Sequence, residues 1–414
     1  MRVRAFLLAL CVTACGCSAP APDVLTFSGS AVGREADILR TQLARFSEDR
    51  GIAVELRSTP DSADQRHQLY VQWLNARAAD PDVLQLDVVW TPEFAAAGWL
   101  LPLDRFSPHT ADFFPAAIDA NRWNGTLFGL PWFIDVGMLY WRTDLFDHPP
   151  ASFDELSAMA RAAINTPDIH YGIVWQGARY EGLVTVFVEH LGGFGGRILD
   201  DSGAVVVDSD AAVRALAWMR DAIHTAGIVP ADVLTWHEEE TRFAFQNGAA
   251  AMMRNWPYAH ALLQAGDSPV TGRVAVAPMP AAQGGEPTAA LGGSQLAINA
   301  RSAQPEAAWA LLAYLTAPAQ MLERARVAGQ YPSRVALYED PELEGALGID
   351  VAAARAIVGA AIPRPVTPVY TQLSEILQIR LHRALTRQQE PRPALEEAAR
   401  EMRALLARVG LRSP

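Results

Sequence analysis

The stretch "DVLQLDVVW" (residues 82–90) decides the fold, because it completes a run of five alternating elements. Six of its nine residues are apolar, which is typical of a strand buried in a sheet. Upstream, "VLTFSGS" (24–30) and "IAVELRS" (52–58) predict two more strands, while residues 34–51 and 63–80 have the apolar spacing of helices. This β-α-β-α-β order predicts an α/β fold with an open, largely parallel sheet.

The carboxyl end of that sheet is where a ligand is expected, since open α/β sheets bind ligands beyond the ends of their strands. Asp87 lies near this end of the third strand. Glu35 lies at the start of the helix that follows the first strand. Both acids are therefore candidates for contacting a ligand.

The remaining sequence continues the alternation of extended and helical segments without a linker. Extended stretches are predicted at residues 127–146, 273–282 and 288–299, and helices at residues 152–164, 181–193, 211–227 and 305–318. The tail from Glu339 onward is mainly helical, with one Pro-rich break at 362–370. Pro and Gly are scattered through the chain, so no segment separates two independent domains.

The N-terminus, "MRVRAFLLALCVTACGC" (1–17), indicates export to the cell envelope. Its basic start and short apolar run predict a signal peptide over residues 1–14. The end of this segment resembles a bacterial lipobox, which implies lipidation of Cys15; ordinary cleavage at a small-residue site and lipidation of Cys17 are the alternatives. Residues 15–23 would form a tether. All three cysteines lie in this region, so the mature domain has no disulfide or thiolate metal site.

Charge and motif content exclude several function classes. The formal net charge of -12 argues against nucleic acid and anionic lipid surfaces as partners. No phosphate loop, dinucleotide fingerprint, nucleophile elbow or paired metal-binding histidines occur, so we expect no cofactor, no metal and no enzyme activity of those kinds. Paired carboxylates for glycoside hydrolysis stay open as an alternative. The acidic run "HEEETR" (237–242) is typical of a solvated helix N-terminus.

Aromatic residues point to a sugar ligand. Several of the 11 tryptophans adjoin Pro, Gly or Asp in predicted loops. Sugars present apolar C–H faces and polar hydroxyl edges, which call for flat rings and charged or polar groups respectively. In "MMRNWPYAHAL" (252–262), Pro257 predicts a helix start, with Trp256 and Tyr258 on either side of it. We therefore expect these two rings to face an opening and to contact a sugar.

Taken together and in order, the motifs resemble the extracellular solute-binding proteins of ABC sugar importers, in the group of maltose-binding protein. "YEGLV", "RNWPYA", "DSPVTGRVAVAP" and "PRPVTPVYTQLSEI" carry a closer likeness to the trehalose/maltose-binding branch. The resemblance implies a monomer with two α/β lobes, each an open, mostly parallel sheet flanked by helices. Three hinge segments would cross between them near 131–136, 275–285 and 329–337. It assigns residues 24–134 plus 280–330 to the N-terminal lobe and 135–279 plus 331–414 to the C-terminal lobe.

The resemblance also implies the ligand and its contacts. An α-linked disaccharide such as trehalose, maltose or a related glucoside would bind between the lobes without chemistry, and the closed form would deliver it to a membrane permease. The implied sugar-binding residues come from both lobes, the crossings and the tail: Glu35, Arg66, Asp87, Asp135, Glu239, Trp256, Tyr258, Gly293 and Arg364.

Two departures and two alternatives accompany this interpretation. Ser294 stands where the branch often has an aromatic residue, and Phe133 stands where it has a tyrosine, so the pocket is expected to be wider or more polar on one side. One alternative is a secreted glycan-active hydrolase that uses paired carboxylates in the same cleft. The other is a binding protein for a solute such as a glycerol phosphodiester, which three acids in the cleft would repel.

Overall fold

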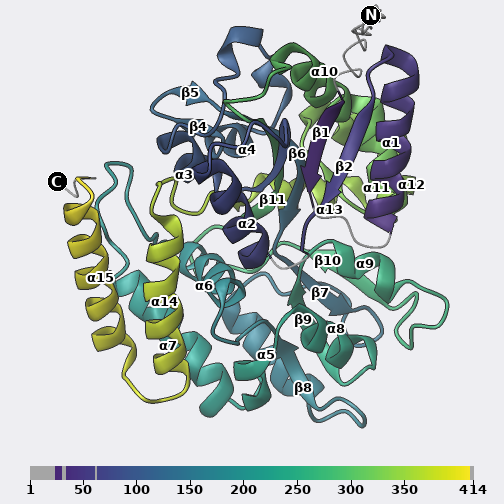
Figure 1. Cartoon of the computed structure of the whole chain (residues 1–414). Coiled ribbons are helices and arrows are strands. Elements are labelled where there is room, and N and C mark those ends of the chain that lie inside the picture. Colours follow the sequence, from purple (N-terminus) through teal and green to yellow (C-terminus); the bar gives the residue numbers. More distant parts are fainter. Residues whose placement is uncertain (1–23, 30–33, 61–62, 411–414) are drawn as a thin grey trace, which may run out of the picture.

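The computed structural model describes residues 24–29, 34–60 and 63–410. The predicted signal peptide, Cys15 and the rest of the predicted tether lie outside the described residues. Two lobes lie one above the other, with the C-terminal helices beside the lower one (Figure 1). Within the described part of the chain, no helix combines the length and the apolar character needed to cross a bilayer.

The first lobe is built on a seven-stranded sheet in the order β12-β6-β11-β3-β1-β2, with β13 paired to β11. Its first three strands are parallel, as predicted, and its register pairs Phe27 with both Leu56 and Val83. The elements of this lobe are β1 (Leu25–Gly29), α1 (Arg34–Arg50), β2 (Val54–Ser58), α2 (Ala63–Asn75), β3 (Val83–Asp87), α3 (Thr91–Ala96), α4 (Pro115–Asp119), β4 (Arg122–Trp123), β5 (Thr126–Leu127), β6 (Gly129–Val136), β11 (Ala289–Ile298), α10 (Pro305–Leu315), α11 (Pro318–Ala328), β12 (Tyr331–Pro332) and β13 (Ala361–Ile362). Helices α12 (Pro341–Leu347) and α13 (Val351–Gly359) lie between β12 and β13 in the chain.

Helices cover both faces of this sheet because successive strand residues point to opposite sides. On β3, Val83 belongs to a core shared with α1, α10 and α11, whereas Leu84 and Leu86 belong to a second core shared with α2 and α3. The three apolar residues of β3 are fully buried because both faces of the strand are covered. The carboxyl ends of β1 and β3 are thereby held rigidly at the edge that faces the second lobe.

The second lobe has a smaller sheet in the order β10-β7-β9-β8, wrapped by helices. Helices α14 and α15 come from the C-terminal tail and pack on α6 and α7 (Figure 1). The elements are β7 (Met138–Arg142), α5 (Phe153–Ala163), β8 (Tyr171–Val174), α6 (Glu181–Gly193), α7 (Asp210–His224), α8 (Glu238–Gln246), β9 (Ala250–Asn255), α9 (Tyr258–Leu263), β10 (Val274–Ala277), α14 (Tyr370–Leu385) and α15 (Pro391–Arg408).

The sheets are mixed, not mostly parallel as the sequence predicted. In the first lobe β11 runs antiparallel to both β3 and β6, and in the second lobe β7 runs antiparallel to both β9 and β10. The physical reason is that these strands belong to the segments that cross between the lobes. Such strands enter a sheet without a preceding crossover helix, which parallel pairing requires.

The crossings lie near two of the three predicted places. β6 of the first lobe leads directly through Gly137 into β7 of the second, and residues 278–288 connect β10 back to β11. Around the third predicted crossing, near 329–337, the contacts are divided between the lobes: β12 pairs with β6 and α12 packs on α11, whereas α13 contacts β10 of the second lobe as well as β6. The lobe boundary at residue 331 stays a prediction.

Candidate ligand-binding site

A cavity of about 510 Å³ lies between the lobes. This volume is within the usual range for small-molecule sites. Both lobes and the connection before α14 contribute to its walls. The lining residues are Glu35, Asp87, Asp135, Tyr180, Glu181, Gly182, Thr185, Glu238, Trp256, Tyr258, Gly292, Gly293, Ala328, Gly329, Gln330 and Arg364.

The first-lobe wall of the cavity is acidic. Asp87 is the last residue of β3, Asp135 lies near the end of β6, and Glu35 lies in the first turn of α1. All three are half-buried. They meet because β3 and β6 both pair with β11 and α1 follows the neighbouring strand β1. This is the strand-end location that the sequence predicted for a ligand.

Burial and mutual repulsion shift the protonation of this wall. Burial, reinforced by the nearby charges of Glu35 and Asp87, raises the pKa of Asp135 to about 7. Burial also raises the pKa of Glu35, although Arg324, Gln330 and Arg66 oppose that shift. The wall therefore carries a carboxyl group that titrates close to neutral pH.

The second-lobe wall of the cavity carries aromatic rings together with the acids Glu181 and Glu238. Trp256 follows the last residue of β9, and its backbone is fixed by two hydrogen bonds: its N–H donates to Asn255 Oδ1 at 2.8 Å, and Tyr140 Oη donates to its carbonyl oxygen at 2.7 Å. The indole Nε1–H points to Glu238 Oε1 at 3.4 Å. The Tyr258 hydroxyl donates to Glu239 Oε1 at 2.6 Å. The rings are thus anchored by their polar atoms and remain half-buried.

Arg364 lies between the two walls. Its side chain is 4% exposed, and its Nη1 donates to Glu181 Oε1 of the second lobe at 2.5 Å. Its Nη2 reaches Asp87 Oδ1 of the first lobe at 3.5 Å and the Leu291 carbonyl oxygen at 3.4 Å. Tyr370 and Ser374 also donate to the Glu181 carboxylate. One guanidinium thus connects both lobes across the cleft.

A second cavity of about 390 Å³ adjoins the first and shares Asp87, Glu181 and Arg364 with it. It opens toward α2 and α14, where His67 and Gln378 line it. The Arg364 bridge therefore forms part of a wall between two compartments of the cleft.

Glycine is required at the floor of the first cavity. Gly293 has a φ of +102°, and a Cβ there would collide with the Phe133 carbonyl oxygen. The pairing of β11 with β6 shifts register between Ser294 and Gln295. Such an irregularity next to a site is a common way to redirect backbone groups.

Seven of the nine predicted site residues line this cavity; Arg66 and Glu239 do not. Arg66 is buried, with its guanidinium carbon 5.2 Å from the centre of the Trp90 ring. Glu239 pairs with Arg242 at 3.0 Å and holds the Tyr258 hydroxyl. These two side chains lie behind the lining and support it.

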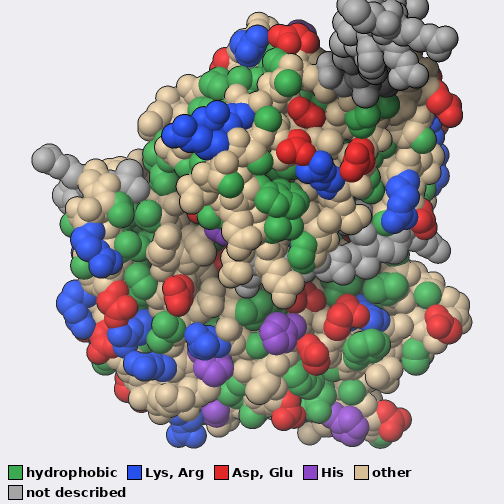
Figure 2. All heavy atoms as spheres, in the orientation of Figure 1, with side chains coloured by type: hydrophobic (Ala, Val, Ile, Leu, Met, Phe, Trp, Pro, Cys, Tyr) green, Lys and Arg blue, Asp and Glu red, His purple; other side chains and the backbone are tan. Residues whose placement is uncertain are grey.

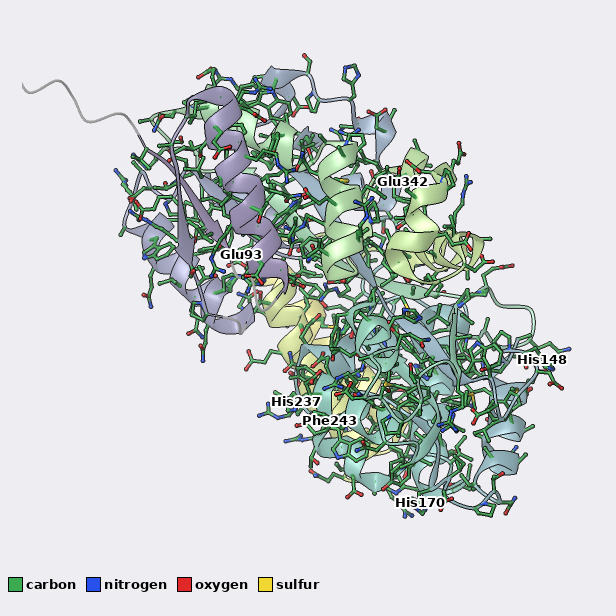
Figure 3. All side chains as sticks on the ribbon, turned by 90° about the vertical axis from the view of Figure 1, so that its right-hand side faces the viewer. Glu93, His148, His170, His237, Phe243 and Glu342 are labelled. Carbon is green, nitrogen blue, oxygen red and sulfur yellow. The ribbon has the colours of Figure 1, made fainter. Side chains whose placement is uncertain are left out.

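Sequence reasoning missed several lining residues. The largest group is Tyr180, Glu181, Gly182 and Thr185, at the start of α6. The motif "YEGLV" contains the first three of them, but nothing in the local pattern showed that this helix starts at the cleft. The acidic run 237–242 predicts a solvated helix N-terminus, and α8 does begin at Glu238, after His237, whose side chain is labelled in Figure 3. The residue that lines the cavity is thus Glu238, one position before the predicted Glu239.

The two departures from the branch pattern do not face the cavity. Ser294 is buried and its hydroxyl accepts a hydrogen bond from Gln85 Nε2 at 3.0 Å. Phe133 is 8% exposed and packs beside Trp132 and Arg324. The expected widening of the pocket at these positions is therefore not observed.

Among the described residues, no group of three His, Cys, Asp or Glu side chains is arranged to hold a metal ion. Charges of both signs are interspersed over the face shown in Figure 2, without an extended basic area. The site is a polar and aromatic cavity that can bind a neutral, hydroxyl-rich molecule.

Two α/β lobes around one interlobe cavity define the class of two-lobe binding proteins. Comparison with known families agrees with that class. The family of bacterial extracellular solute-binding proteins matches residues 33–322. The chain therefore belongs to this family.

Relatives cover nearly the whole chain. A probable ABC transporter-binding protein of Deinococcus radiodurans is 36% identical over 96% of this chain and 97% of its own length. The maltose-bound structure of MalE3 from T. maritima is 43% identical, with a TM-score of 0.84 over 92% of this chain and 99% of that one. A solute-binding protein of Thermotoga lettingae bound to alpha-D-tagatose is 26% identical, with a TM-score of 0.80 over 92% and 99% of the two chains.

Proposed function

We propose that this protein is the sugar-binding component of an ABC importer and binds an α-linked disaccharide, such as maltose, trehalose or a related glucoside. The observation that carries this proposal is the pairing of an acidic wall with an aromatic wall in one interlobe cavity. Carboxylates accept hydrogen bonds from sugar hydroxyls, while the indole and phenol rings cover the C–H faces. The maltose bound by a relative of 43% identity supports this ligand class.

Sugar binding would favour lobe closure, because the ligand contacts both walls at once. Asp87 and Asp135 belong to the first lobe, and Trp256 and Tyr258 to the second. A ligand shifts a conformational equilibrium only by its differential affinity for the two states. A sugar that touches both walls meets this condition, and the closed form would be presented to the permease.

Isothermal titration calorimetry tests the proposal directly. The mature protein is titrated with maltose, trehalose, a longer maltodextrin, tagatose and glycerophosphodiesters. We expect the tightest binding for an α-linked disaccharide and no measurable heat for the phosphodiesters, which Glu35, Asp87 and Asp135 repel. Absence of binding to every sugar would contradict the proposal.

The anchor is proposed from the N-terminal sequence alone. We infer lipidation at Cys15, which would tether the protein to a membrane of the cell envelope. In cells expressing Cys15→Ser, the protein is expected in the soluble fraction, whereas Cys17→Ser should stay membrane-bound. The opposite distribution would assign the lipid to Cys17. Mass spectrometry of the mature N-terminus identifies the lipidated cysteine directly.

A glycoside hydrolase remains the second candidate, because Asp135 titrates near pH 7 beside Asp87 and Glu35. A carboxylic acid with such a pKa would suit a general acid. We expect instead that bound disaccharide is recovered unmodified after long incubation with the purified protein. Release of monosaccharide above a Trp256→Ala control would favour the hydrolase.

A further inference from the structure

Arg254 lies directly behind the Trp256 ring and belongs to strand β9 of the second lobe. Its guanidinium carbon is 4.0 Å from the ring centre. The side chain has no exposed surface, whereas the Trp256 ring is half-buried and lines the cavity. One face of the indole is therefore covered by a buried cation, which leaves the rest of the ring for the ligand.

The guanidinium is held by a hydrogen bond at each of its three nitrogens. Its Nε donates to Glu189 Oε2 at 2.7 Å, and its Nη2 donates to Glu189 Oε1. Its Nη1 donates to Gln176 Oε1 at 3.0 Å, and Gln176 Nε2 in turn donates to the Arg254 carbonyl oxygen at 3.2 Å. A planar fork held at three nitrogens cannot rotate or slide without breaking buried hydrogen bonds. The plane behind the ring is therefore rigid.

The same ion pair contacts the segments that join the lobes. Gly137 stands between β6 and β7, and a Cβ at this position would collide with Glu189 and Arg254. The backbone N–H of Ala290, at the start of β11, points to Glu189 Oε1 at 3.4 Å. The first two crossings thus lie next to the Glu189 carboxylate, and Glu189 is paired with the Arg254 guanidinium behind the Trp256 ring.

We propose that Arg254 is the positioning residue for Trp256, and that the Glu189–Arg254 pair links the position of this ring to the crossings at Gly137 and Ala290. The ligand side of this inference rests on the proposed function, while the placement of the ring does not. A movement of the crossings during closure would be passed to the ring through one rigid ion pair.

Stability alone gives no reason for a charged pair at this place. Replacing a buried ion pair by apolar residues of similar volume is often neutral or stabilising. An apolar pair would fill the same space but would give the indole no planar cation to contact. A cation–π contact is strongest when the cation is desolvated, as that of Arg254 is here. This difference allows the positioning role to be separated from a packing role.

The test uses the double variant Glu189→Met/Arg254→Met, which leaves no unpaired buried charge. A matched control is Arg142→Met/Asp144→Met, which removes the largely buried Arg142–Asp144 pair that begins on the adjacent strand β7. The first measurement needs no sugar: ¹⁵N NMR of the indole N–H groups, with Trp256 assigned by Trp256→Phe. We expect the Trp256 resonance to shift and broaden in the double variant and to stay unchanged in the control.

The second measurement is a double-mutant cycle for sugar affinity by calorimetry. The double variant should raise Kd by about tenfold or more, in line with a desolvated cation–π contact. On a Trp256→Ala background, tested at high sugar concentration, the same change should leave Kd unaltered. If the double variant does not fold, Arg254→Lys serves both measurements, since it keeps the charge opposite Glu189 and removes the planar fork.

An unchanged Trp256 resonance would overturn the positioning role, and an equal loss of affinity on both backgrounds would show that the pair does not act through the ring. If the wild-type protein binds no sugar, the proposed function fails by itself, and the NMR measurement still decides the role of Arg254.

Discussion

The two walls of the cleft offer a ligand different interactions. The first-lobe wall presents Glu35, Asp87 and Asp135, whereas the second-lobe wall adds the rings of Tyr180, Trp256 and Tyr258 to its two acids, Glu181 and Glu238. Carboxylate hydrogen bonds depend on protonation, so they change with pH. Contacts with aromatic faces depend on apolar area and shape, which pH leaves almost untouched. The comparison predicts that the acids of the first-lobe wall make the sugar affinity depend on pH. The aromatic rings should supply a large part of the affinity that does not change with pH.

Removing the principal ring should have the largest effect. We expect Trp256→Ala to raise the Kd for the preferred sugar by about 100-fold, since buried aromatic anchors commonly contribute on the order of 2–4 kcal/mol to binding. The thermal midpoint without sugar should change little, because the ring is half-buried. Calorimetry and thermal unfolding measure the two effects.

The matched control for this change is Trp309→Ala, which removes a ring of the first lobe that stacks on Phe106 at 4.8 Å, away from the cavity. Its Kd should equal that of the wild type. Equal affinities of the Trp256 and Trp309 variants would assign the aromatic wall to packing only.

The acidic wall should make sugar affinity depend on pH. The pKa of Asp135 is raised to about 7, chiefly by burial and then by Glu35 and Asp87. Sugar hydroxyls donate better to the ionised carboxylate, so below pH 7 binding must expel a proton. We expect affinity to rise, by up to about tenfold per pH unit, as pH increases toward about 7 and to level off above it.

Asp135→Asn should flatten this pH profile while leaving binding by the rings in place. Titrations at pH 5, 6, 7 and 8 compare the variant with the wild type, and Asp112→Asn, a surface acid paired with Arg334, serves as control. A wild-type affinity that falls with rising pH would mean that the neutral acid donates to the sugar instead.

The same group should affect the stability of the sugar-free protein with a definite sign. The pKa of Asp135 rises from 3.8 to about 7 on folding, so the folded state holds more protons between these values. Its contribution is fully present below pH 3.8 and is lost as pH rises through about 7. Relative to Asp135→Asn, the wild type should therefore lose several degrees of thermal midpoint between pH 5 and pH 8. Parallel stability curves for the two proteins would contradict the shifted titration.

The smallest effect is expected for Tyr258→Phe. The Tyr258 hydroxyl is committed to Glu239, so its loss removes a supporting hydrogen bond and leaves the ring. We expect Kd to rise by about two- to fivefold, consistent with a net hydrogen-bond contribution near 0.5–1 kcal/mol. A loss as large as that of Trp256→Ala would show that the hydroxyl itself contacts the sugar.

Local sequence patterns predicted those parts of the molecule in which a short segment determines its own structure. The alternation over residues 24–90 indicated the first sheet, and Pro257 indicated the start of α9. The apolar runs of the crossing strands could not reveal their direction, because antiparallel and parallel buried strands read alike. The mixed sheets therefore followed only from three-dimensional pairing.

The same distinction applies to the site. Asp87 and Trp256 were predicted because a strand end and a proline mark their surroundings. Glu181 was missed because its partners, Arg364 and Tyr370, are 183 and 189 residues away in the chain. Arg254 was missed for a similar reason: its role depends on Glu189 and on the crossings, which no local pattern connects with it.

The most direct test of the two-wall account is a crystal structure of the protein with its tightest-binding disaccharide. The account predicts one sugar ring over the Trp256 face turned away from Arg254, with hydroxyls within hydrogen-bonding distance of Asp87 and Asp135. A sugar bound outside this cavity, or inside it without contact to either wall, would contradict the account.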